Sequence, residues 1–169
     1  MFTTTIDQCL LYVRHEYEFH LNTKEVNEPL LSFYKNRCAG GTLVLWRKHL
    51  DPYITVLPTE SPAILPISLS IPGVSPSIHT CIYLPTHGRD NDFLQEISNL
   101  KCFLHTISAQ HSDHTVCLRG DKNANKKNTT RCNLITNIFT EFSINEVYIE
   151  HPTYHHFVGN GLFDSNIMI

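Results

Sequence analysis

The sequence predicts an α+β fold, a mixed β-sandwich flanked by helices, and two observations carry this prediction. Short apolar runs separated by prolines fill the region from 41 to 84, which is typical of strands joined by turns. From 93 onward the apolar residues recur at steps of three and four, which indicates a helix, and strand-like and helix-like segments then alternate. Strands followed by strand–helix alternation favour a sheet sandwich with helices on its outside.

Composition places few limits on function. The chain has 169 residues, a net charge of −3 and 41% hydrophobic residues, which fits one domain and gives no global sign of nucleic-acid binding. No run of about 18 apolar residues occurs, so we expect no transmembrane helix and no membrane partner. The first residues do not resemble a signal peptide. The six cysteines are scattered, and four of them fall in strand-like or helix-like runs: Cys81, Cys117, Cys102 and Cys132. We therefore expect a reduced, intracellular protein whose thiols are buried.

Residues 1–39 form a poorly patterned N-terminal segment, in which only residues 10–13 suggest a strand. The patterned domain covers 40–169 and begins with a glycine pair that leads into an apolar strand. Residues 48–52 read as a turn. The β-branched and aromatic content predicts strands at 42–46, 53–57, 64–71 and 78–84.

Two helices are predicted after these strands. The first carries the apolar stripe Phe93, Ile97, Leu100, Leu104 and Ile107, and Asn91 or Asp92 could cap its first turn. The second covers residues 134–142. Between them we expect a buried strand at 115–118, and after them a short strand at 147–149.

The turn after residues 115–118 carries the strongest chemical signal. Gly120 is expected to end the strand and to allow a tight turn. Asp121 and Asn123 then offer an anionic oxygen and a neutral amide, which suit orienting a water and holding a phosphate oxygen. The alternative is a plain turn in which one of them only makes a side-chain turn bond. The turn lies in a local excess of positive charge: Arg119, Lys122, Lys126, Lys127 and Arg131.

Three stretches occur in a characteristic order: Tyr83-Leu84-Pro85 followed by His87-Gly88-Arg89, then Gly120-Asp121-Lys122-Asn123, then residues 151–157 running into 164–167. Together with the Gly40-Gly41 strand, this order resembles the endonuclease/exonuclease/phosphatase superfamily. More narrowly, it resembles the endonuclease domain of non-LTR (LINE-type) retrotransposons. The resemblance covers residues 40–169 and implies a partial domain of that superfamily, truncated and incomplete at both ends.

The resemblance implies a role for individual positions. Asp121 would orient or deprotonate the attacking water, and Asn123 would contact the scissile phosphate. Tyr83 would lie near the phosphate, although a core tyrosine with a satisfied hydroxyl is the alternative. Substrate DNA would be contacted through its phosphate backbone by a turn residue, a neighbour of the catalytic pair and a C-terminal loop: Arg89, Lys122, Thr153 and His155.

The cofactor implied by the resemblance is Mg²⁺, which needs hard oxygen ligands. The metal-binding glutamate of the family is not recognisable ahead of Gly40, and Glu16 is the best substitute. Met168 stands where relatives carry an aspartate in a Ser-x-Ile-Asp pattern. We therefore expect a degenerate remnant of a magnesium-dependent DNA endonuclease, weakly active or inactive. The alternatives are a non-catalytic nucleic-acid-binding or inert fragment and a phosphatase-like phosphoesterase.

Overall fold

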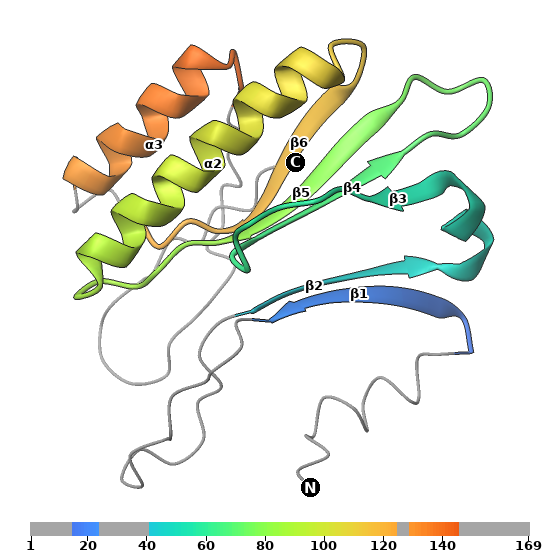
Figure 1. Cartoon of the computed structure of the whole chain (residues 1–169), viewed down its shortest axis with the longest axis horizontal. Coiled ribbons are helices and arrows are strands. Elements are labelled where there is room, and N and C mark those ends of the chain that lie inside the picture. The colour runs from blue at the N-terminus through green and yellow to red at the C-terminus, as the bar shows by residue number, and fades with distance from the viewer. Residues whose placement is uncertain (1–14, 24–40, 125–128, 146–169) are drawn as a thin grey trace, which may run out of the picture.

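The computed structural model describes residues 15–23, 41–124 and 129–145 (Figure 1). Within these residues the chain forms an α+β fold with two β-sheets and two α-helices. This confirms the predicted α+β class and is compatible with a mixed sandwich. The predicted strands at 10–13 and 147–149 lie outside the described residues. None of the described helices is long and apolar enough to cross a membrane.

The larger sheet has four strands in the order β3-β4-β5-β6. The first three strands pair antiparallel, whereas β5 and β6 pair parallel, because the long helix α2 (Asp90–Gln110) connects them. The strands are β3 (Ile54–Val56), β4 (Ile64–Leu69), β5 (Ser77–Tyr83) and β6 (Thr115–Asp121). Each lies where the sequence predicts a strand, with shifted bounds.

Helices α2 and α3 (Thr129–Glu141) cover one face of this sheet (Figure 1). The core beneath them contains the predicted apolar stripe of α2 and the inward side chains of β5, such as Ile78 and Ile82. The predicted cap was wrong. Arg89 occupies the N-cap position without a side-chain cap bond, while Asn91 and Asp92 lie inside the first helical turn.

A second sheet lies on the opposite face (Figure 1) and contains β1 (Tyr17–Thr23) and β2 (Gly41–Arg47). It packs through β2 against β4 and β5. Asn22 ties β1 to the larger sheet, because its Nδ2 donates to the carbonyls of Ser61 at 3.0 Å and Ile64 at 3.3 Å. The sequence did not predict β1, which falls in the poorly patterned segment. A 3-10 helix, η1 (Lys48–Tyr53), replaces the predicted turn.

Gly120 does not end its strand, because β6 continues to Asp121. Its φ of +130° is open mainly to glycine, and a Cβ atom there would lie 1.9 Å from the carbonyl oxygen of Ile82. Gly120 therefore permits the close approach of β6 to β5. Cys102 is exposed on α2, so its predicted burial was wrong.

Candidate functional site

The candidate site lies where β5 and β6 end. Because these strands are parallel, their carboxyl ends meet at one edge, where ligands commonly bind in sheets with parallel strands. Tyr83 and Asp121 are the last residues of the two strands and are direct register partners. Register partners direct their side chains to the same face, so the phenol and the carboxylate leave the sheet from adjacent positions on one face.

This face is the one turned away from the helices. Ile82 is buried in the core under α2 and α3, so the alternation along the strand turns Tyr83 to the other side. Tyr83 is 38% exposed and Asp121 is half-buried, so solvent reaches the pair. The predicted tyrosine and aspartate are therefore brought together on an accessible surface.

Asn123 closes the turn after β6 in a left-handed conformation, with a φ of 45°. Its backbone N–H donates to Oδ1 of Asp121 at 2.9 Å, and its side-chain Nδ2 donates to the carbonyl of Leu84 at 2.7 Å. The backbone N–H of Leu84 donates to the carbonyl of Asp121 at 2.9 Å. The side-chain turn bond considered as the alternative is thus present. One such bond leaves a carboxylate with further acceptor sites and an amide with a second N–H.

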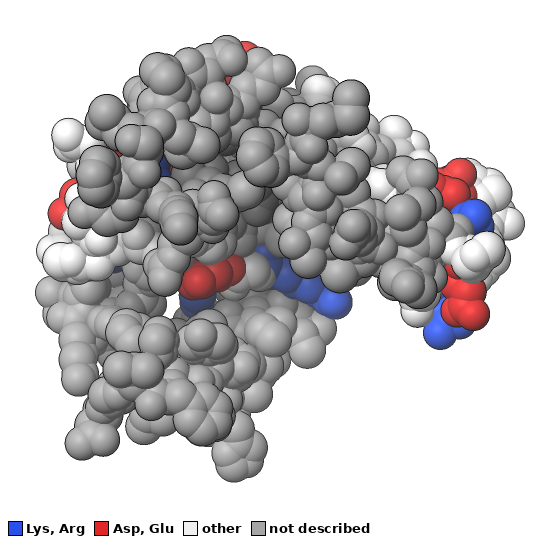
Figure 2. Space-filling view, turned by 90° about the horizontal axis from the view of Figure 1, so that it is seen from below, with Lys and Arg blue, Asp and Glu red and all other residues white. Residues whose placement is uncertain are grey.

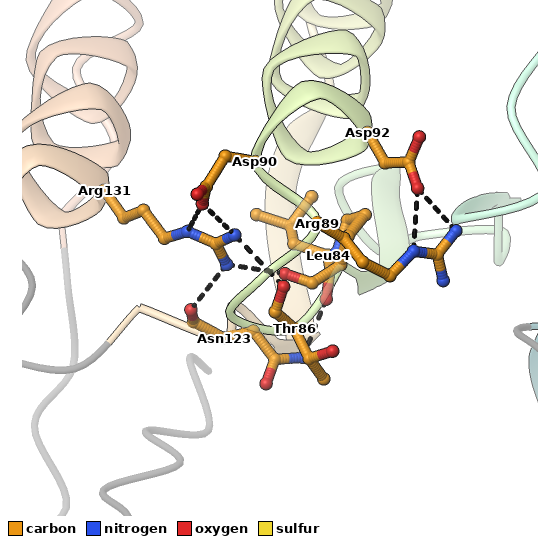
Figure 3. Close-up of polar contacts among 8 residues, drawn as sticks. Leu84, Thr86, Arg89, Asp90, Asp92, Asn123 and Arg131 are labelled. Carbon is orange, nitrogen blue, oxygen red and sulfur yellow. Dashed lines mark hydrogen bonds and ion pairs between the residues drawn. The ribbon is translucent and has the colours of Figure 1, made fainter.

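Arg131 of α3 holds this end of the sheet together (Figure 3). Its Nη1 donates to the carbonyls of Pro85 at 2.7 Å and Asn123 at 3.3 Å, and its Nη2 donates to the carbonyl of Thr86 at 3.1 Å. Nη2 also lies 2.6 Å from Oδ1 of Asp90. The side chain is 3% exposed. Sequence reasoning counted Arg131 only as part of a basic cluster and missed this role.

The described members of the predicted basic cluster do not gather on one surface. Lys122 is buried, and its Nζ lies 5.6 Å from the ring centroid of Phe139 in α3. A phosphate contact would require the Lys122 side chain to give up this contact. Arg89 is half-exposed and pairs with Asp92 at 2.6 Å (Figure 3). Only Arg119, among the described members of the cluster, is exposed on the face of Asp121. Lys126 and Lys127 lie outside the described residues.

The structure does not bring Glu16 to Asp121. Glu16 precedes β1, and its carbonyl accepts the N–H of Lys48. Asn22 lies near the carboxyl end of β5, because it bonds to Ile64, whose register partner in β5 is Ile82. Glu16 is six residues before Asn22, which is roughly 20 Å along an extended strand. In the described ranges no group of three or more His, Cys, Asp or Glu could hold a metal ion. Thr153 and His155, the predicted loop contacts, lie outside these ranges.

Among the described residues, Arg119 is an exposed positive group on the same sheet face as Asp121. Burial, together with the charge of Arg119, lowers the pKa of His79, and burial raises the pKa of the Cys81 thiol. Both shifts favour the neutral forms near pH 7, so the two half-buried groups add no charge.

Charged side chains of both signs gather at the end of the molecule where β1 begins, as Figure 2 shows from below. The ion pair of Lys48 and Glu18 lies at this end.

No model of a known protein family matches this chain, and no curated protein matches it. A functional conclusion therefore depends on the sequence motifs and on the arrangement of Tyr83, Asp121 and Asn123.

Proposed function

We propose that this chain is a remnant of a magnesium-dependent DNA endonuclease of the endonuclease/exonuclease/phosphatase superfamily, similar to the endonuclease domain of LINE-type retrotransposons. One observation carries the proposal. Tyr83 and Asp121 end two parallel strands as direct register partners, and Asn123 is bonded to both Asp121 and the residue after Tyr83. Three side chains suited to phosphodiester hydrolysis therefore meet at one edge of the sheet.

The roles follow from the chemistry of each group. The carboxylate of Asp121 would accept a proton from the attacking water, and the remaining amide N–H of Asn123 would donate to a phosphate oxygen. The phenol of Tyr83 would donate to the same phosphate. The exposed guanidinium of Arg119, two residues before Asp121, supports binding of an anion on this face.

The donor set fits Mg²⁺ only weakly. Mg²⁺ is usually bound by one or two carboxylates together with water and substrate phosphates, and when bound it stabilises the charge that develops on the phosphate and the leaving oxygen. Asp121 supplies one carboxylate, and among the described residues no group of three or more His, Cys, Asp or Glu could hold a metal ion. We therefore expect slow turnover.

The test is nicking of supercoiled plasmid with Mg²⁺ and with a chelator. Asp121→Asn should reduce the rate by about 100-fold or more, because the general base is lost. Asp113→Asn is the matched control, because Asp113 lies just before the opposite end of β6 and is exposed. Nicking that is equal in both variants would show that the activity does not come from this site.

A non-catalytic nucleic-acid-binding protein is the second candidate, because turn bonds already engage Asp121 and Asn123. It would retain a labelled DNA duplex without cleaving it, and its affinity would fall as salt is raised. Hydrolysis of a small phosphomonoester, with neither DNA retention nor nicking, would instead point to a phosphatase-like enzyme. The absence of all three activities from the folded protein would contradict the proposed function.

A further inference from the structure

The turn that carries Asn123 is held against its own backbone preference. A φ of 45° is uncommon for any residue with a side chain, although asparagine tolerates it better than most. Such conformations persist where the surrounding structure determines them from several directions. Asn123 meets this condition, because its N–H, its side-chain amide and its carbonyl each make a hydrogen bond.

Arg131 accounts for one of these bonds and supports another. Its guanidinium has only hydrogen-bond donors. It donates to the carbonyl of Asn123 and to the carbonyls of Pro85 and Thr86. Those two residues directly follow Leu84, which receives the amide of Asn123. One guanidinium therefore binds Asn123 and the two residues that follow Leu84, on either side of the bond between Asn123 and Leu84 (Figure 3).

The position of Arg131 is itself well determined. Its guanidinium carbon lies 4.1 Å from the ring centroid of Phe93, and Asp90 at the start of α2 receives Nε and Nη2. The planar fork of arginine can serve carbonyls on one side and a carboxylate on the other. A lysine carries its charge on one nitrogen and cannot reproduce these directions.

We propose that Arg131 is the positioning residue of the candidate site: it keeps the Asp121–Asn123 turn in its left-handed form and locks it to the Leu84–Thr86 segment. It does not touch the substrate. The inference rests on the proposed function only in assigning a phosphate to this turn.

Hydrogen exchange of individual backbone amides in Arg131→Lys tests the inference. The reporters are the N–H groups of Asn123 and Leu84, which donate to Oδ1 and to the carbonyl of Asp121. Both should exchange roughly tenfold faster. Losing a hydrogen bond lowers the free energy of local opening by about 1 kcal/mol, which raises the open fraction by roughly that factor. The internal reference is the N–H of Val74, which donates to Ile71 in a distant turn and should not change.

Lys101→Gln is the control variant, because it removes a surface pair between α2 and α3, with Lys101 and Glu141 2.9 Å apart, away from the site. It should leave all three reporters unchanged. Where the wild type nicks DNA, Arg131→Lys should lower the rate at saturating plasmid about tenfold and leave DNA affinity unchanged, since the residue acts through Asn123. Asp90→Asn, which keeps the arginine, should accelerate exchange at Asn123 to a smaller extent.

Unchanged exchange at Asn123 in Arg131→Lys would overturn the inference, as would equal acceleration at Asn123, Leu84 and Val74, which would indicate general loosening. If Arg131→Lys fails to fold, unchanged exchange in Asp90→Asn overturns the inference in its place. Selective acceleration at Asn123 and Leu84 in a protein that never nicks DNA would support the positioning role and reject the endonuclease. The two proposals therefore fail independently.

Discussion

Two arginine–aspartate pairs involve the first turn of α2, and they differ in burial and in the other partners of the arginine. The pairs of Arg131 with Asp90 and of Arg89 with Asp92 have the same closest distance, 2.6 Å. Arg131 is 3% exposed and reaches three backbone carbonyls, whereas both side chains of the Arg89 pair are 49% exposed. The first pair joins two helices and two loops, while the second stays within one helical turn.

The difference shows that partners and burial, rather than ionic distance, decide what such a pair does. An exposed pair is screened by water and contributes about 0–1 kcal/mol. A buried guanidinium loses its hydration, so its position is stable only because carbonyls, a carboxylate and the Phe93 ring replace the water. The pair of Arg131 and Asp90 thereby links α3 to the Asn123 turn, and the pair of Arg89 and Asp92 does not.

The largest effect is expected from Gly120→Ala, at the end of β6 that carries the Asn123 turn. The new Cβ would lie 1.9 Å from the carbonyl oxygen of Ile82, so β6 would have to move away from β5. We expect a loss of more than about 4 kcal/mol in the free energy of unfolding, measured by chemical denaturation. Gly73→Ala is the matched control: its φ is also positive, at 80°, but nothing lies within 4 Å, so only backbone strain of about 1–3 kcal/mol applies. Equal losses would show that the close approach has no cost.

The comparison itself is tested by truncating each arginine. Arg131→Ala should lower the free energy of unfolding by about 2–4 kcal/mol, because three carbonyls lose their donor and the stacking on Phe93 is lost. Arg89→Ala should cost less than about 1 kcal/mol. Denaturant midpoints of the two variants provide the measurement, and similar midpoints would reject the distinction between the pairs.

The smallest effect concerns the pH dependence of stability that arises from His79, on the sheet face turned away from the helices. Burial, with the charge of Arg119, lowers the pKa of His79 below its ordinary value of 6.5, so the unfolded chain binds a proton at a pH where the folded chain does not. The contribution of His79 to stability is therefore present above pH 6.5 and is lost as the pH falls below it. His79→Gln should flatten the loss of stability between pH 7 and the folded pKa, as measured by chemical denaturation at several pH values. His20→Gln, at an exposed position of β1, should not. A slope unchanged by His79→Gln would contradict this assignment.

Much of the fold could be predicted from local pattern, and so could part of the site. The spacing of Phe93, Ile97 and Leu100 identified α2, because helical periodicity brings such residues to one face regardless of the rest of the chain. Asp121 and Asn123 could be paired as candidates because they are two residues apart. The distance between Glu16 and Asp121 could not be predicted, since it depends on how the two sheets are placed.

The sequence by itself determined the regular elements that have a strong period and the local turn chemistry of Asp121 and Asn123. Only the tertiary structure decided that residues 17–23 form a strand, because that segment acquires its partners from β2. It also placed Tyr83 beside Asp121, turned Gly120 into a point of close contact, and buried Arg131 while leaving Arg89 in water. The physical reason is that periodicity is a property of neighbouring residues, whereas strand register and the burial of a charge depend on groups that are distant in the chain.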